Sequence, residues 1–373
     1  MLLTEFPASL HNWAVTTNGR RASSNGRLPA DPITIADVAR RARVSTATVS
    51  RVLTRYPHVS DHTRRRVEAA LQYLRYEPNR IARSLRARAT HTIGLIIRDA
   101  ANTKFGLIAK AAQQVANARG YYVLVGSSDR SADRERESID LLLQLRVDGL
   151  VLYVADERVN HLANRKRLDI PVVLVESTLP GYAFDEVCSD NVGGARAATE
   201  HLLGLGHRRI ALLHGPRDIR PLRERRQGYL EAYAAAGVRP DPALIVETGT
   251  REEDAAEHTT RLMTGAAPPT AIFAASSALT IGVLQAIRAQ RLRVPETLSV
   301  IGFDDTDVTA LVDPPLTVVT RDLHLLGATA VETLMERLAD GPRGPAKRIV
   351  LPATLHVRES CAPPASRRGT AAH

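Results

Sequence analysis

Short apolar segments alternate with longer amphipathic segments over most of this chain, and that alternation restricts its fold more than any other feature. Apolar runs of four to six residues occur at 93–97, 121–125, 149–154, 172–175, 210–214, 271–275 and 298–303. Intervening segments, such as 106–118 and 193–205, repeat their apolar residues at helical spacing. Strands that alternate with helices usually pair in parallel, so we expect an α/β body of parallel sheets flanked by helices.

Length and composition narrow the class of protein. A body of about 280 residues exceeds the size at which a single core keeps growing, so two packed lobes are expected. The apolar runs are far shorter than the ~20 residues of a membrane span, and the first residues lack a signal-peptide pattern. Cys188 and Cys361 provide no disulfide framework. We therefore expect a cytoplasmic protein that does not enter a membrane.

Positive charge is concentrated near the start of the chain. The net charge is +10, and residues 31–90 hold 13 Arg against five acidic side chains. Residues 91–373 hold 34 basic and 34 acidic side chains and are therefore neutral. A short basic module ahead of a neutral body indicates a polyanionic partner, most simply nucleic acid.

The basic module has the pattern of three short helices between residues 33 and 77. Thr34, Ser45 and Ser60 are placed to cap the three helices, and Pro78 is expected to end the third. A four-residue turn at 42–45 would join the first two helices, which fits a helix-turn-helix. We expect an all-α headpiece in front of the α/β body.

Motifs in one consistent order identify the family that the sequence resembles. They read ITIADVARRARVSTATVSRV at 33–52, VSDHTRRRVEAALQYLRYEPNR at 59–80, IARSLR at 81–86, VDG at 147–149, LGHRRIALLHG at 205–215 and LSVIGFDD at 298–305. Over about residues 32–360 the chain resembles LacI/GalR-family transcription regulators. The resemblance divides it into a disordered extension at 1–31, a helix-turn-helix headpiece at 32–78, a hinge at 79–91, an effector-binding body at 92–362 and a disordered tail at 363–373.

The resemblance also implies which residues contact DNA. The helix at 45–53 would lie in the major groove, where Arg51 can form two hydrogen bonds with a guanine. In the family, a hinge helix inserts a leucine, here Leu85, into a minor-groove step. Each serine could instead be a plain helix cap, and Leu85 could pack on the body. The expected contacts are Thr34, Ser45, Thr46, Ala47, Ser50, Arg51, Thr54, His58, Ser60, Thr63, Asn79, Ala82 and Leu85.

The body resembles periplasmic sugar-binding proteins, which have two lobes and a cleft between them. The first lobe is expected at 92–190 with 321–342, and the second at 191–320 with 343–362. Ligands of such folds bind outside the carboxyl ends of parallel strands. For Arg225 and Asp304 the alternative is an ion pair between the lobes. The expected effector contacts are Asn102, Phe105, Asp129, Tyr153, Glu176, Arg225, Ser276, Asp304 and Arg321.

Four places depart from the family pattern. Arg43 stands where a glycine with positive φ is usual, and Thr54-Arg55 replaces an Asn-Gly-like loop. Ser276-Ser277 replaces an Asn-Asp pair, and Arg251 stands where an aromatic ring often stacks on the sugar. The effector is expected to be a sugar or sugar derivative, but these changes make a plain neutral hexose less expected. Arg251 could favour a phosphorylated or acidic ligand, or it could point to solvent.

Three classes of function fit parts of the sequence. A transport binding protein would need a signal peptide and no basic headpiece. For an enzyme, no P-loop, GxSxG elbow or HExxH motif occurs, so neither catalytic residues, a metal nor a cofactor is expected. The third class, a DNA-binding regulator that acts as a repressor, fits the whole chain. We expect a homodimer on a near-palindromic operator, with a tetramer as the alternative.

Overall fold

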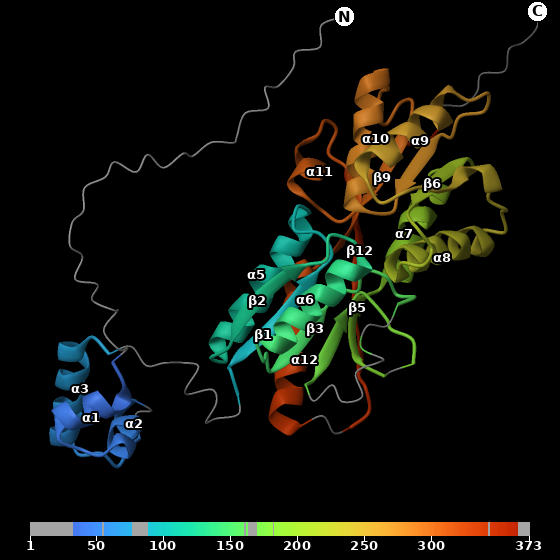
Figure 1. The fold of residues 1–373 in the computed structure, drawn as a ribbon. Helices are drawn as coiled ribbons and strands as arrows, with labels where there is room; N and C mark the ends of the chain where they lie inside the picture. The colour runs from blue at the N-terminus through green and yellow to red at the C-terminus, as the bar shows by residue number, and fades with distance from the viewer. Residues whose placement is uncertain are drawn as a thin grey trace, which may run out of the picture. The chain divides into compact units, whose positions relative to one another are not determined.

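The computed structural model describes residues 33–53, 56–76, 89–159, 162, 170–181, 183–341 and 344–364. The chain divides after Arg80 into two compact units, which are taken separately below (Figure 1). Several sequence predictions lie outside the described residues: the extension at 1–31, most of the hinge and tail, and the DNA contacts Thr54, Asn79, Ala82 and Leu85.

The first unit is the three-helix headpiece that the sequence predicts. Its helices are α1 (Ile35–Ala42), α2 (Thr46–Leu53) and α3 (Asp61–Leu74). Apolar residues at helical spacing on each helix meet in one core, formed by Val38, Ala39, Ala42, Val49, Val52, Val67 and Ala70. The buried side chains leave the opposite face of each helix to solvent.

The predicted caps start all three helices. The backbone N–H groups of Thr48 and Thr63 donate to the hydroxyls of Ser45 and Ser60, at 3.1 and 3.4 Å. Thr34 donates its hydroxyl to Asp37 at 2.7 Å. The two serine bonds pair backbone N–H groups that the start of a helix leaves free, and Asp37 also accepts the backbone N–H of Thr34 at 2.9 Å.

Two residues with a left-handed backbone conformation, Arg43 and Arg75, follow the ends of α1 and α3. Arg43 has φ 51°, so the turn keeps the conformation for which the family uses glycine. The third helix ends at Leu74, before Pro78, which corrects the expectation that the proline ends it. Arg75 is left-handed with φ 48°, and the N–H of Tyr76 bonds to the carbonyl of Leu71 at 3.0 Å, which closes the helix.

The second unit is the body, and its first lobe is built on a six-stranded parallel sheet. The strands lie in the order β11-β5-β4-β3-β1-β2. Their bounds are β1 (Thr92–Ile97), β2 (Tyr122–Ser127), β3 (Gly149–Leu152), β4 (Val172–Val175), β5 (Asp185–Ser189) and β11 (Arg348–Leu351). Helices α5 (Thr103–Ala118), α6 (Ala132–Gln144) and α12 (Leu323–Asp340) accompany this sheet.

The second lobe repeats this plan. Its sheet has the order β12-β10-β9-β8-β6-β7 and is parallel except for the antiparallel pair of β10 with β12. The strands are β6 (Ile210–His214), β7 (Ile245–Glu247), β8 (Ala271–Ala274), β9 (Ser299–Phe303), β10 (Thr317–Arg321) and β12 (Ala353–His356). The helices are α7 (Asn191–Gly204), α8 (Arg220–Ala235), η1 (Pro242–Leu244), α9 (Glu252–Thr264), α10 (Ser277–Gln290) and α11 (Asp307–Leu311).

Each sheet is covered by helices on both faces (Figure 1). In β1, Leu95 packs in a cluster with α5 and α12, and its neighbour Ile96 packs in a cluster with α6. Alternate residues of a strand point to opposite faces, so one apolar run fills two cores. This confirms the two-lobed α/β body with parallel sheets.

The chain passes between the lobes at three neighbouring points, near Asp190, Asp322 and Pro352. The N–H of Asp190 bonds to the carbonyl of Leu351 at 2.8 Å, which ties two of these crossings together. The sequence had placed residues 343–362 in the second lobe, but β11 pairs with β5 in the first sheet. The third crossing therefore lies at Pro352, and only the chain after it belongs to the second lobe.

Candidate functional site

The exposed face of α2 carries the side chains expected to read DNA. Thr46, Ala47 and Arg51 are exposed, whereas Val49 and Val52 of the same helix are buried in the headpiece core. A helix with one apolar face buried presents its remaining residues as a single surface, and helix-turn-helix proteins insert that surface into the major groove.

Hydroxyl groups lie at the starts of all three headpiece helices. Capping a helix uses only part of the hydrogen-bonding capacity of a hydroxyl, which has one donor and two acceptor positions. A capping hydroxyl can therefore also hydrogen-bond to a DNA phosphate. The structure leaves Thr34, Ser45, His58 and Ser60 exposed, and Ser50 and Thr63 half-buried. Tyr56, which the sequence reasoning missed, lies with its ring centre 5.9 Å from the Arg51 guanidinium.

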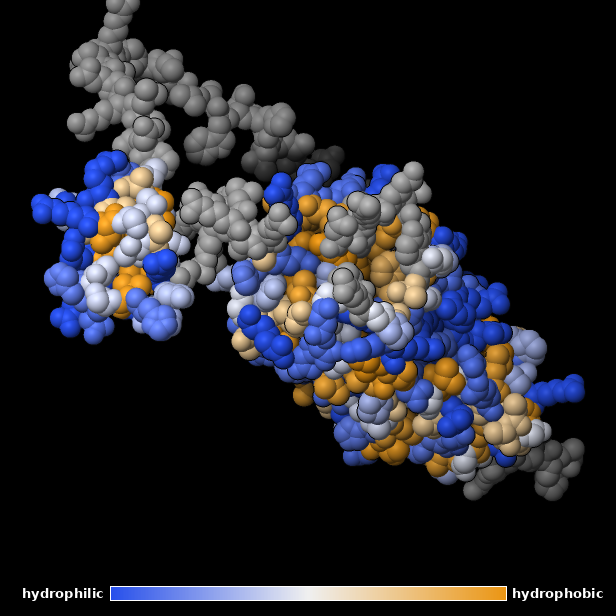
Figure 2. Space-filling view, turned by 90° about the horizontal axis from the view of Figure 1, so that it is seen from below, coloured by the Kyte–Doolittle hydropathy of each residue, from blue (hydrophilic) through white to orange (hydrophobic). Residues whose placement is uncertain are grey.

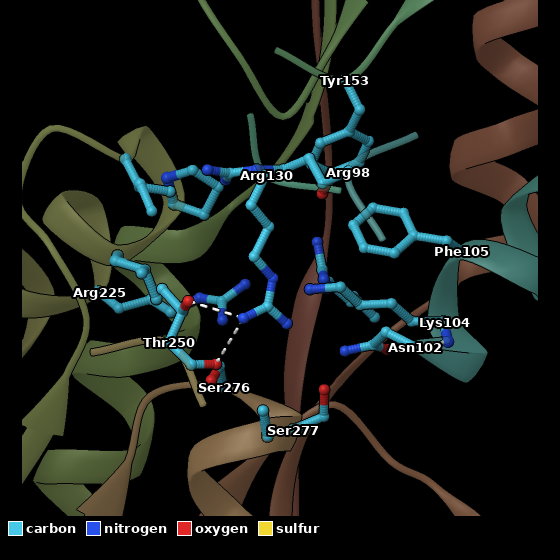
Figure 3. Close-up of a pocket in the computed structure, with 15 residues that line it drawn as sticks. Arg98, Asn102, Lys104, Phe105, Arg130, Tyr153, Arg225, Thr250, Ser276 and Ser277 are labelled. Carbon is cyan, nitrogen blue, oxygen red and sulfur yellow. Dashed lines mark hydrogen bonds between the residues drawn. The ribbon is translucent and has the colours of Figure 1, made fainter. Parts of the chain in front are cut away.

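A second candidate site is a pocket between the two lobes of the body. Six of the nine expected effector contacts line it: Asn102, Phe105, Tyr153, Arg225, Ser276 and Arg321. Phe105 and Tyr153 meet edge to face, with ring centres 4.9 Å apart, and form an aromatic wall from the first lobe. Arg225 faces them from α8 of the second lobe (Figure 3).

A buried ion-pair cluster centred on Arg321 lies at the base of the pocket. Arg321 donates Nε to Asp304 and Nη1 to Glu176, both at 2.6 Å. Glu176 follows β4 of the first lobe and Asp304 follows β9 of the second, so one guanidinium joins the lobes. Burial alone would raise the pKa of both carboxyls, but Arg321 outweighs it, and the pKa of each lies below its ordinary value.

Glu176 and Asp304 differ in what they leave for a ligand. Glu176 is fully bonded, because it also accepts from the Ser189 backbone at 3.0 Å and from Asn191 at 2.9 Å. Asp304 keeps Oδ2 buried, with no hydrogen-bond partner in the described part of the chain. The same holds for Nη2 of Arg321 and the hydroxyl of Ser277, both of which belong to pocket-lining residues.

Arg225 is fixed by the second lobe. It donates Nε to Asn191 at 2.9 Å and Nη1 to the carbonyl of Ala275 at 2.6 Å, and its guanidinium lies 3.4 Å from the centre of the Phe303 ring. Burial and the neighbouring Arg321 lower the pKa of Arg225 to about 10. Gly228 lets α8 approach this closely, because a Cβ there would lie 2.2 Å from the carbonyl oxygen of Val192 on α7.

The structure corrects the prediction for Asp129 and shows how Ser276 and Arg251 are placed. Asp129 was expected in the pocket, but it is exposed and ion-paired with Arg134, and its neighbour Arg130 lines the pocket instead. Ser276 lines the pocket, but its hydroxyl accepts the Leu279 N–H at 3.3 Å and serves as the cap of α10. Of the two alternatives given for Arg251, the structure agrees with the second, because the side chain points to solvent beside Asp254 and is 70% exposed.

The sequence reasoning missed most of the charge in this pocket. Arg98, Lys104 and Arg130 line it in addition to the predicted residues, together with Thr250 and Ser277 (Figure 3). Arg130 donates to the hydroxyl of Thr250 at 2.8 Å, which is a contact between the lobes. The strand-end rule did point to the correct loops, since Arg98 follows β1 and Arg130 lies beyond β2.

The remaining surface gives fewer indications of a binding site. The visible face of the body mixes polar residues with scattered apolar patches (Figure 2). Within the described parts of the chain, no helix has both the length and the apolar character needed to cross a bilayer. The described residues likewise contain no cluster of three or more His, Cys, Asp or Glu placed to bind a metal ion.

Comparison with known proteins gives the same two-part organisation. Residues 34–79 match the family described as bacterial regulatory proteins, lacI family, and residues 199–361 match a periplasmic binding protein-like domain. The chain is 34% identical over 333 residues to the HTH-type transcriptional regulator DegA of Bacillus subtilis, a match that covers 88% of this chain and 98% of that protein.

Two further matches extend over similar lengths. The ribose operon repressor of Haemophilus influenzae is 32% identical over 330 residues, which is 88% of this chain and 98% of the repressor. A crystal structure of the lac repressor dimer bound to operator and the anti-inducer ONPF has 30% identity and a TM-score of 0.78. That match covers 89% of this chain and 99% of the lac repressor chain.

Proposed function

This chain belongs to the LacI family of bacterial regulatory proteins, and on that premise we propose that it represses transcription under control of a small molecule. The headpiece binds operator DNA, and the pocket between the lobes binds the effector. We assign no catalysis to the pocket, since the relatives named above are regulators, and we place the protein in the cytoplasm, where operator DNA is reached.

One observation carries the effector assignment. Three buried polar atoms have no hydrogen-bond partner among the described residues: Ser277 Oγ and Arg321 Nη2 of the pocket lining, and Oδ2 of Asp304, which is bonded to Arg321. Folded proteins rarely leave buried polar groups unpaired, because each costs roughly 1–3 kcal/mol. A ligand that supplies an acceptor to Arg321 and a donor to Asp304 would complete this set.

The proposed DNA contacts follow from the headpiece. Thr46, Ala47, Ser50 and Arg51 of α2 would read base edges, and the hydroxyls at the helix starts would bind phosphates. The hinge contacts, including Leu85, remain part of the proposal, although they lie outside the described residues. Sugars and sugar derivatives are the proposed effectors, since the relatives include a ribose operon repressor.

We also propose that the protein acts as a homodimer. The edge strand β2 is poorly covered, with Tyr122 52% and Val125 54% exposed. Leu107 and Leu141, from helices that contact this strand, are exposed as well. An apolar strand edge of this kind is a ready surface for a second copy, and two headpieces are needed for a near-palindromic site. Sedimentation of the full chain at micromolar concentration tests this, and a monomer with full operator affinity would contradict it.

The effector assignment is tested with an operator selected in vitro from random DNA. Operator affinity of the full-length protein is measured by fluorescence anisotropy, with and without each member of a panel of sugars and sugar derivatives. A true effector changes the affinity, and Asp304→Ala should abolish that change. Asp129→Ala is the matched control, because this aspartate lies outside the pocket and its loss should preserve the response. An Asp304→Ala variant that responds at the wild-type ligand concentration would refute the pocket assignment.

A further inference from the structure

Positive charge surrounds the pocket between the lobes. Among the residues that the structure describes, no Asp or Glu lines it and five cationic side chains do: Arg98, Lys104, Arg130, Arg225 and Arg321. They come from both lobes and point toward one space, as the labelled members in Figure 3 show. Such a concentration of like charge in a partly dry site is unfavourable unless anions offset it.

Nearby carboxylates offset only part of this charge. Arg130 pairs with Asp99 at 2.7 Å, and Arg321 pairs with Glu176 and Asp304. Among the described residues, the other three cations have no carboxylate within 4.0 Å. Three carboxylates therefore contact two of the five cations, and positive charge around the pocket remains in excess.

The three uncompensated cations have neutral partners instead. Arg98 donates to the carbonyl of Ala155 at 2.9 Å, and Arg225 to neutral oxygens of the second lobe. Lys104 lies at the start of α5, with its Nζ 5.0 Å from the centre of the Phe105 ring. Burial and the neighbouring cations lower the pKa of Lys104 to about 7. The charge of Asp304 favours the ammonium form from a distance, but it does not offset burial and the neighbouring cations. An anion in direct contact would stabilise the charged form.

We propose that the effector carries an anionic group, a phosphate ester or a carboxylate, which binds between Lys104, Arg225 and Arg321. This inference rests on the proposed function and adds the chemical class of the ligand. Arg321 Nη2 and the Ser277 hydroxyl are the unpartnered groups that would donate to the anion. Asp304 Oδ2 is an unpartnered acceptor, so a hydroxyl on the same ligand would satisfy it.

The shape of the cleft agrees with a ligand that has one charged end. The inner cavity measures about 80 Å³, room for roughly five to eight waters, which suits a single charged group. An outer cavity of about 240 Å³ adjoins it and shares Arg130, Ile219 and Thr250. The outer lining mixes both signs of charge, with Asp156, Glu157, Arg158 and Asp218, and such groups suit the hydroxyls of a sugar. A wholly neutral ligand would leave Arg98, Lys104 and Arg225 without an anion in contact.

Inorganic phosphate is the probe for the charged end. The melting temperature of the full-length protein is followed over a phosphate titration, with chloride added to keep the ionic strength constant. Phosphate should raise the melting temperature by ~2 °C or more. Lys104→Gln should weaken the apparent phosphate affinity ~10-fold or more. Lys110→Gln is the matched control, because Lys110 is an exposed residue of the same helix.

The outcomes separate this inference from the function on which it rests. Loss of the phosphate effect in Lys104→Gln alone supports the anionic subsite. No effect beyond that of chloride, or equal loss in both variants, overturns it. The inference would also be overturned if a neutral sugar made the protein release operator DNA and the phosphate ester of that sugar did not. That result would leave the proposed function intact. Failure of the wild-type protein to bind any operator would instead refute the function, whatever phosphate does.

Discussion

Removing the guanidinium that joins the two lobes should destabilise the body strongly. The side chains of Glu176 and Asp304 are fully buried, and Arg321 is the cation bonded to both. Arg321→Met keeps the length of the side chain but leaves two buried carboxylates without their counter-charge. Breaking a buried ion pair from one side costs about 3–5 kcal/mol. Since 1 kcal/mol shifts the melting temperature of a large domain by about 2–4 °C, we expect a fall of at least ~6 °C.

Urea unfolding of the full chain, followed by circular dichroism, measures this loss. Arg251→Met is the matched control, because its exposed ion pair should contribute less than ~1 kcal/mol. Adding Glu176→Gln and Asp304→Asn to Arg321→Met should restore stability, since no unpaired buried charge then remains. A loss below ~1 kcal/mol, or a triple variant no more stable than the single one, would refute the reasoning.

The pH dependence of that difference has a definite sign. In the wild type, the lowered pKa values of Glu176 and Asp304 stabilise the fold above their unfolded pKa values, and this stabilisation is lost as the pH falls. In Arg321→Met, burial without a counter-charge should raise both pKa values, so that the variant gains stability as the pH falls. The gap between the two proteins should therefore be smaller at about pH 5 than at pH 7.

Three further outcomes are expected. Arg51→Ala should reduce the preference for particular bases and cost about 1–3 kcal/mol of binding free energy on the best operator. Arg65→Ala should weaken binding to all DNA sequences about equally or not at all. Competition anisotropy with operator variants distinguishes these results. Operator affinity should fall with salt at a log–log slope of about −7 for roughly eight phosphate contacts, and a slope shallower than about −2 would exclude the basic headpiece as the DNA contact. Lys104→Gln should stabilise the protein by ~1 kcal/mol or more near pH 7, because the lowered pKa of Lys104 destabilises the wild type there. Urea unfolding should show this gain vanish above about pH 10, where Lys104 is neutral in the unfolded chain as well. Lys110→Gln, the control, should leave the stability unchanged at every pH.

The sequence predicted the strands that form apolar runs, including the largely exposed edge strand β2. Strands β3, β4 and β8 are buried along their whole length, and each stands out as an apolar run. The strands β7, β11 and β12, which lie at sheet edges, are only partly buried and were missed. The inner strands β5 and β10 were missed as well, because they mix polar with apolar residues. An edge strand is selected by the sheet beside it more than by its own composition, so local pattern carries little signal there.

The sequence was enough to predict which loops form the pocket, but not which side chains in those loops line it. The rule that ligands bind beyond the carboxyl ends of parallel strands pointed to the loop after β2. Within that loop it favoured Asp129, but Asp129 and Arg130 both have positive φ, and only Arg130 reaches the pocket. The rule also gave no reason to single out Lys104, because its role depends on charges contributed by both lobes.

The three crossings between the lobes have a consequence for how such a regulator changes over generations. Neither lobe is encoded by one continuous stretch, so exchanging a lobe with that of a related gene requires junctions near Asp190, Asp322 and Pro352 at once. The headpiece, in contrast, is a single compact unit that ends by Arg80. One recombination event can therefore give an existing sensor a new set of target genes, whereas a change of ligand has to arise by point substitution in the cleft.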